Sequence, residues 1–289
     1  MAATELDLAY DHCRRMTRTQ AKNFYYAFRT LPLPKRQAIY AVYAFCRLCD
    51  DIADEPNSIE EKRRLLAGVR SSLQAMSSVQ TGDRVFAALS HAATEFGIPV
   101  EYLEEVVEGV EMDLTRSRYQ TFDDLWTYCY KVASVAGLIS IEIFGYTGEE
   151  ARQRAIDLGI AMQLTNILRD LKEDAARDRI YIPQDELAGA GYSEAELKRG
   201  VMNAGYRRLM SMQVVRAREY FAKGRDLLPM VSARSRACPE MLSEVYTRIL
   251  DRIEASGYDV FSRRIGLSKP EKLAMTVKLW AASYLPGRR

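Results

Sequence analysis

The chain has 289 residues, 48% of them hydrophobic, and can bury one sizeable core. Its 41 basic and 39 acidic residues give a net charge of only +2, which argues against nucleic acid as a partner. Cys46 and Cys49 form one CxxC pair, but no second pair follows and the chain has only two histidines, so reduced thiols in a cytoplasm are expected rather than a zinc site. The polar N-terminus and the lack of a long uncharged apolar run predict neither a signal peptide nor a transmembrane helix.

Helical patterns run from one end of the chain to the other. The nine prolines fall at plausible helix boundaries, and the segments between them carry apolar residues at helical spacing. Alternating strand patterns and glycine-rich phosphate loops are absent from the sequence. We therefore expect one all-α domain, residues 1–289, with helices near 5–17, 20–30, 35–55, 59–77, 82–96, 100–113, 122–145, 149–175, 201–227, 239–256 and 270–283.

The predicted helix 35–55 ends in an acidic block. Asp50 and Asp54 lie four residues apart, directly after the almost wholly apolar run 38–46. A helix that is apolar all round is typical of the protein interior, and residues i and i+4 share one face. The pattern predicts a buried helix that ends with two carboxylates pointing the same way.

The predicted helix 149–175 repeats this arrangement with Asp170 and Asp174, and Asn166 lies one turn earlier on the same face. Two carboxylates about 6 Å apart repel by about 3 kcal/mol at an effective dielectric constant of about 20. Cations between the pairs would relieve this, and oxygen ligands without His or Cys favour magnesium, which usually also binds substrate phosphates. The sequence predicts a diphosphate substrate and several Mg²⁺ ions, held by Asp50, Asp54, Asn166, Asp170 and Asp174.

These motifs carry a resemblance to a known family. The chain resembles the squalene/phytoene synthases, which are head-to-head trans-isoprenyl diphosphate synthases, over nearly its whole length. The matching stretches are 27–54, 128–134, 163–183 and 246–264. One DxxxD motif is weak evidence, but two, the second led by Gln163-Leu-Thr-Asn-Ile-Leu-Arg-Asp170, are specific. The resemblance implies an isoprenoid synthase helical bundle around a central apolar cavity.

The implied activity is a magnesium-dependent prenyl transfer. Two molecules of farnesyl or geranylgeranyl diphosphate would condense head to head through a cyclopropyl diphosphate, releasing diphosphate and giving a squalene- or phytoene-type product of carotenoid or hopanoid biosynthesis. Residues 179–187 resemble phytoene synthases, whereas 50–55 are closer to bacterial squalene synthases, and a slight preference goes to the C15 substrate. NADPH would be needed if the product is squalene.

The resemblance also implies roles for individual residues. Tyr128 matches a family tyrosine near the cyclopropanation chemistry, and Arg47 would act with the four aspartates in catalysis. Arg47 and Arg169 could instead simply pair with neighbouring aspartates. Ser134 stands where glycine is commoner in the family and could narrow the cavity. The expected substrate-binding residues are Lys22, Phe24, Phe28, Arg47, Gln163, Asn166, Arg169, Tyr246 and Arg263.

Two other functions stay open at this point. A terpene cyclase would act on one prenyl diphosphate, although its usual second motif differs from the Asn166/Asp170/Asp174 set. A non-catalytic scaffold member of the family should have lost its aspartate motifs. The tail 267–285 mixes Lys, Trp, Tyr and aliphatic residues, which suits either a last helix on the core or peripheral contact with the inner membrane face. A monomer in the cytoplasm is expected.

Overall fold

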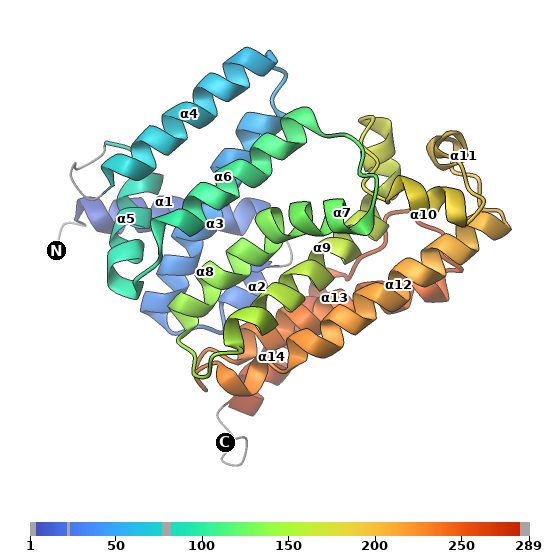
Figure 1. The fold of residues 1–289 in the computed structure, drawn as a ribbon. Helices are drawn as coiled ribbons and strands as arrows, with labels where there is room; N and C mark the ends of the chain where they lie inside the picture. The colour runs from blue at the N-terminus through green and yellow to red at the C-terminus, as the bar shows by residue number, and fades with distance from the viewer. Residues whose placement is uncertain (1–3, 22–23, 77–81, 284–289) are drawn as a thin grey trace.

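The computed structural model describes residues 4–21, 24–76 and 82–283, and these form an all-α bundle, as predicted (Figure 1). The described residues contain no β-strand, only isolated bridges between Arg118 and Ile180 and between Tyr146 and Val231. The α-helices are α1 Glu5–Gln20, α2 Phe24–Phe28, α3 Leu33–Asp54, α4 Ile59–Ala75, α5 Arg84–Phe96, α6 Val100–Thr115, α7 Phe122–Cys129, α8 Val135–Phe144, α9 Ala151–Ala176, α10 Gln184–Gly189, α11 Glu194–Arg199, α12 Ala204–Arg225, α13 Ala237–Ala255 and α14 Lys269–Ser283. A π-helical segment, η1 Tyr130–Ser134, joins α7 to α8, and a 3₁₀ turn, η2 Leu228–Met230, follows α12.

The long predicted helices are confirmed, and the short ones differ. The predicted helix 20–30 shrinks to α2, and the helices α10 and α11 were not predicted. Each of these two has only six residues, too few to show a helical period. A capping box nevertheless marks the start of α11, where Ser193 and Glu196 exchange hydrogen bonds with each other's backbone.

The predicted continuous helix 122–145 is confirmed as Phe122–Phe144, but its centre, η1, is π-helical rather than α-helical. Two glycines from other helices allow close packing against this π-helical segment. A Cβ atom on Gly159 of α9 would lie 2.5 Å from Ser134 Cα, and one on Gly109 of α6 would lie 3.0 Å from the Val132 side chain. Single-turn π segments often occur at functional sites, so η1 is a candidate part of one.

The helix α9 occupies the middle of the bundle and packs against α8, η1, α12 and α13 (Figure 1). The buried residues of α3 lie between Ala38 and Ala53 and include most of the apolar run 38–46, as that run predicted. Both acidic motifs therefore lie at the C-terminal ends of core helices. The segment Phe122–Phe144 is long and apolar enough to cross a membrane by composition alone, but half of its most apolar window is buried in the fold, as in a core helix.

Candidate active site

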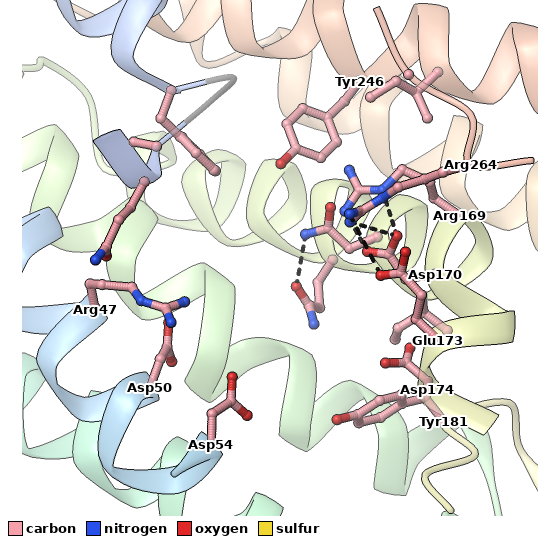
Figure 2. Close-up of a pocket in the computed structure, with 18 of the residues that line it drawn as sticks. Arg47, Asp50, Asp54, Arg169, Asp170, Glu173, Asp174, Tyr181, Tyr246 and Arg264 are labelled. Atoms are coloured by element: carbon pink, nitrogen blue, oxygen red, sulfur yellow. Dashed lines mark hydrogen bonds and ion pairs between the residues drawn. The ribbon is translucent and has the colours of Figure 1, made fainter. Parts of the chain in front are cut away.

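A polar cavity of about 670 Å³ opens between the ends of α3 and α9. Asp50 and Asp54 stand on the α3 side, and Asp170 and Asp174 stand on the α9 side, with the cavity between them (Figure 2). Tyr246 of α13 lies at another edge of the same opening. The structure thus brings together the two acidic motifs, which are more than a hundred residues apart in the sequence.

An apolar cavity of about 320 Å³ adjoins the polar one. Its walls come from α2, α3, η1, α8 and α9, and Phe28 is among the residues that line it. The residues that line both cavities are Phe24, Tyr43, Asp50, Gln163 and Asn166. A polar mouth therefore leads directly into an apolar chamber, which is the central cavity that the sequence predicted.

Two aspartates of this mouth, one from each acidic motif, have raised pKa values. Desolvation raises the pKa of Asp50 to about 7, with Asp54 and Asp113 adding to the effect and Arg47 opposing it. Desolvation also raises the pKa of Asp174 to about 7, helped by Asp170. At these two positions, desolvation and neighbouring carboxylates outweigh the arginines that oppose them, and a bound divalent cation would favour the ionised form of both.

The arginines around the mouth are distributed unevenly. Arg169 donates to Asp170 with Nε–Oδ1 at 2.9 Å, and Arg264 donates to the same carboxylate at 3.0 Å. Arg47 pairs with Asp51 and not with Asp50 or Asp54. The neighbouring aspartate is therefore the partner of both Arg47 and Arg169, as the simpler interpretation of the sequence allowed.

The donor set fits a divalent ion shared with a substrate. The Oδ1 atom of Asn166 is buried without a hydrogen-bond partner and lines both cavities. Within the described residues, no group of three or more His, Cys, Asp or Glu side chains could hold a metal ion by itself. Carboxylates on two separate walls suit magnesium, which binds through one or two carboxylates and completes its shell with water and phosphate oxygens.

Most of the predicted site residues lie where expected. The polar cavity is lined by Phe24, Arg47, Asp50, Asp54, Gln163, Asn166, Arg169, Asp170, Asp174 and Tyr246. Lys22 lies outside the described residues.

Three expectations need correction. Arg263 is exposed and lines a neighbouring hollow but not the mouth, whereas Arg264 lines both, so Arg264 is the arginine of this non-helical segment that reaches the mouth. Tyr128 lines neither of the two cavities. It lies buried beneath the mouth, and its hydroxyl donates to Asp113 at 3.1 Å. Ser134 does not narrow the chamber, since its hydroxyl donates to Ile156 O on α9 at 2.8 Å.

Several residues of the mouth were missed in the sequence. Asp113 of α6 accepts hydrogen bonds from Tyr128 and from Tyr181, the latter at 3.0 Å, and burial raises its pKa. A signal for it existed, because Asp113 lies three and seven residues after the buried Val110 and Val106, on the apolar face of its helix. The other missed residues lie in irregular segments after helices, where helical periodicity gives no information about direction; they are Arg177, Arg179, Tyr181 and Arg264.

Comparison with known proteins gives a consistent result. The squalene/phytoene synthase family model matches residues 17–271. The chloroplastic phytoene synthase 2 of Solanum lycopersicum is 39% identical over 98% of this chain and 93% of that protein. The 15-cis-phytoene synthase of Synechococcus elongatus is 38% identical over 98% of this chain and 96% of that protein. Among solved structures, a dehydrosqualene synthase in complex with ligand has a TM-score of 0.88 at 26% identity, covering 96% of this chain and 97% of that chain.

The all-α bundle, the acidic mouth and the apolar chamber define a prenyltransferase of the isoprenoid synthase class. The chain belongs to the squalene/phytoene synthase family. Its activity is the head-to-head condensation of prenyl diphosphates, as expected from the sequence, and the family needs a divalent metal. The terpene cyclase alternative finds no support, and the scaffold alternative is set aside because the chain is an enzyme.

Proposed function

We propose that this enzyme condenses two molecules of geranylgeranyl diphosphate into a phytoene-type product. The observation that carries the proposal is the direct connection between the acidic mouth and the apolar chamber, which suits a charged head with a long hydrocarbon tail. The C20 substrate is favoured because full-length relatives at 38–39% identity are phytoene synthases. This proposal of a C20 substrate replaces the slight preference for a C15 substrate that the sequence suggested.

The residues of the mouth would hold the diphosphate head. Magnesium, when bound, supplies Lewis-acid stabilisation of the departing diphosphate. Asp50 and Asp54 on one wall, and Asn166, Asp170 and Asp174 on the other, are the proposed metal ligands. The guanidinium groups of Arg47, Arg169 and Arg264 would contact phosphate oxygens, since their planar forks fit this geometry. Gln163 and Tyr246 line the same mouth, and Lys22 stays a prediction.

The chamber would hold the prenyl tails and exclude water from the allylic cation. Phe24 lies where the mouth meets the chamber, with its ring centroid 5.9 Å from that of Phe28 and 6.2 Å from that of Tyr246. Desolvated aromatic faces stabilise cations. Tyr128, which reaches the mouth only through Asp113 and Tyr181, is proposed as a positioning residue rather than a group that touches substrate.

The runner-up is condensation of farnesyl diphosphate. The close fit to a dehydrosqualene synthase supports it, since that protein shares the fold along 96% of this chain. NADPH would be required only if two farnesyl diphosphates are converted to the reduced C30 hydrocarbon squalene.

A direct assay separates these possibilities. Purified enzyme is incubated with Mg²⁺ and either farnesyl or geranylgeranyl diphosphate, with and without NADPH, and the hydrocarbons are identified by mass. We expect a C40 product from geranylgeranyl diphosphate, equal with and without NADPH, and slower conversion of farnesyl diphosphate. Faster formation of a C30 product would contradict the C20 assignment, and turnover without a divalent metal would contradict the role of the aspartates.

We also propose that residues 1–289 act as a single-domain cytoplasmic monomer that touches the inner membrane face through α14. Leu273 and Val277 lie one turn apart on this helix and are 55% and 56% exposed. Liposome flotation would test the contact, and equal flotation of the enzyme and a Leu273→Glu/Val277→Glu variant would rule it out. Light scattering would test the monomer.

A further inference from the structure

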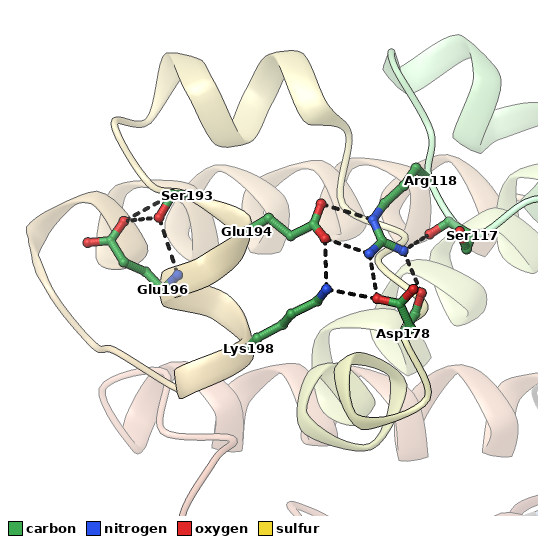
Figure 3. Close-up of polar contacts among 7 residues, drawn as sticks. All are labelled: Ser117, Arg118, Asp178, Ser193, Glu194, Glu196 and Lys198. Carbon is green, nitrogen blue, oxygen red and sulfur yellow. Dashed lines mark hydrogen bonds and ion pairs between the residues drawn. The ribbon is translucent and has the colours of Figure 1, made fainter.

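A network of charged side chains fastens the turn after α9 to the rest of the fold. Arg118, just after α6, lies between Asp178 in that turn and Glu194 of α11, and Lys198 completes the group (Figure 3). These residues line none of the cavities described above. The turn itself does, because Arg177 and Arg179 on either side of Asp178 line the polar mouth.

The turn ends α9 in a conformation that normally requires glycine. Arg179 N donates to Asp174 O at 2.9 Å and Asp178 N donates to Ala175 O at 3.1 Å, which is the hydrogen-bond pattern of a Schellman motif. The position with left-handed backbone is occupied by Asp178, with φ of 58°. A residue with a Cβ atom is disfavoured there, and such strain persists only where the surrounding structure fixes it.

Arg118 supplies that constraint. All five of its N–H donors are used. Nε and one Nη2 donor bind Glu194 at 2.9 and 2.5 Å, and the second Nη2 donor binds Asp178 Oδ1 at 2.8 Å. The Nη1 donors bind Ser117 O at 2.7 Å and Asp178 O at 2.5 Å. Lys198 Nζ lies 2.8 Å from Asp178 Oδ1. Lysine at position 118 could not reproduce this fork of contacts.

The turn after α9 also contacts the acidic motif of α3, on the opposite wall of the mouth. Arg177 and Arg179 place their guanidinium groups 3.7 and 3.8 Å from Asp54, a residue of α3. Asp54 has no nearer cation among the described residues. The backbone also couples the two segments, since Ile180 N donates to Ser117 O at 2.9 Å. Fixing Asp178 therefore also fixes the two residues beside it that form ion pairs with Asp54 within the described part of the chain.

We propose that Arg118 is a positioning residue that sets the affinity of the mouth for diphosphate by holding Arg177 and Arg179 in place. The inference rests on the proposed function, because it takes the mouth to be the diphosphate site. The network should therefore affect binding of the diphosphate head of the substrate. Binding of the apolar tail should not change, since the chamber is built from other segments.

The test uses separate probes for head and tail. Calorimetry measures binding of inorganic diphosphate in the presence of Mg²⁺, and quenching of intrinsic fluorescence measures binding of geranylgeraniol, which lacks the phosphates. For Arg118→Met we expect about tenfold weaker diphosphate binding, a typical cost of losing an outer-shell partner. We expect KM to rise more than kcat falls, and geranylgeraniol binding to stay within about twofold of the starting enzyme, with little recovery in Arg118→Lys.

Arg218→Met is the matched control. Arg218 also bridges two carboxylates, Asp251 at 3.0 Å and Glu254 at 2.6 Å, but lies away from the mouth. It should keep both binding constants. If Arg118→Met does not fold, Asp178→Gly carries the test, because glycine accepts the left-handed backbone while removing the bound carboxylate.

A double-mutant cycle with Arg179→Met distinguishes positioning from a general loss of stability. If Arg118 acts through Arg179, its replacement adds little once Arg179 is gone. Unchanged diphosphate binding in Arg118→Met, fully additive losses in the cycle, or a parallel loss of geranylgeraniol binding would each overturn the inference. An unmodified enzyme that binds no diphosphate would instead refute the proposed function.

Discussion

The two walls of the mouth carry the same acidic motif in different electrostatic surroundings. On the α9 wall, Asp170 accepts hydrogen bonds from Arg169 and Arg264 at 2.9 and 3.0 Å. On the α3 wall, the nearest arginine in sequence, Arg47, is bound to Asp51 instead. Asp170 on α9 is thus directly paired with two arginines, whereas on α3 Arg47 influences Asp50 without pairing with it, and Asp54 meets arginines from another segment.

This difference shows that spacing alone does not define a metal site. Among the described residues, Asp54 of α3 forms ion pairs with the two arginines of the turn after α9, at 3.7 and 3.8 Å. Asp50 has its pKa raised to about 7, chiefly by burial. A divalent cation should therefore stabilise the α3 wall more than the α9 wall, because Asp170 already accepts hydrogen bonds from two arginines, whereas the arginines near Asp50 and Asp54 act at longer range.

Removing a carboxylate from each wall gives the largest expected effect. We expect Asp50→Asn to lower kcat/KM by about 10²–10³-fold, the usual cost of losing one electrostatic contribution to a transition state. Asp170→Asn should cost about tenfold less, because Arg169 and Arg264 would be released to bind the diphosphate. Steady-state kinetics over a range of Mg²⁺ concentrations would measure both, and only Asp50→Asn should need much more Mg²⁺.

Asp251→Asn serves as the control, since Asp251 forms an exposed ion pair with Arg218 far from the mouth. It should keep full activity and the same Mg²⁺ dependence. A larger loss in Asp170→Asn than in Asp50→Asn would show that the arginines of the α9 wall do not compensate, and the proposed difference between the walls would be wrong.

In the absence of metal, the free energy of unfolding should depend on pH. Asp50 and Asp174 have folded-state pKa values of about 7, against about 4 in an unfolded chain. Between these values the unfolded chain releases protons that the folded protein keeps, so the free energy of unfolding falls as pH rises from 4 to 7. The midpoint of thermal unfolding should be higher at pH 5 than at pH 8 by a few degrees, and Mg²⁺ should raise it more at pH 8.

Calorimetric or fluorescence melting curves would check this, with Asp50→Asn as the comparison. The variant should show a smaller dependence on both pH and Mg²⁺ than the original enzyme. A melting temperature that rises from pH 5 to pH 8 in chelator, or a response to Mg²⁺ that is the same at both values, would contradict the raised pKa values.

Much of the mouth was predictable because helical periodicity records which residues share a face. The spacing of Asp50 with Asp54, and of Asn166 with Asp170 and Asp174, placed all five on the cavity. The apolar runs before them correctly predicted buried helices. These inferences needed only local sequence, since both motifs lie within regular helices.

Features that depend on contacts between distant segments escaped prediction. The π-helical segment η1 packs against Gly109 and Gly159, which lie on two other helices. The partners of Arg118 are 60 and 76 residues away in the sequence. Arg263 and Arg264 are chemically identical neighbours, and only the path of an irregular chain decides which one faces the mouth.

That last pair provides the smallest and most specific test of the α9 wall. Arg264→Ala should raise KM for the prenyl diphosphate about fivefold with little change in kcat, because an exposed ion pair or phosphate contact contributes about 1 kcal/mol. Arg263→Ala should stay within about twofold, since this residue does not line the mouth. Both are measured by initial rates at saturating Mg²⁺. The two substitutions remove the same charge one residue apart, so a general change in surface potential would affect them equally. A larger effect at Arg263 would mean that the segment turns when substrate binds and would restore the assignment made from the sequence.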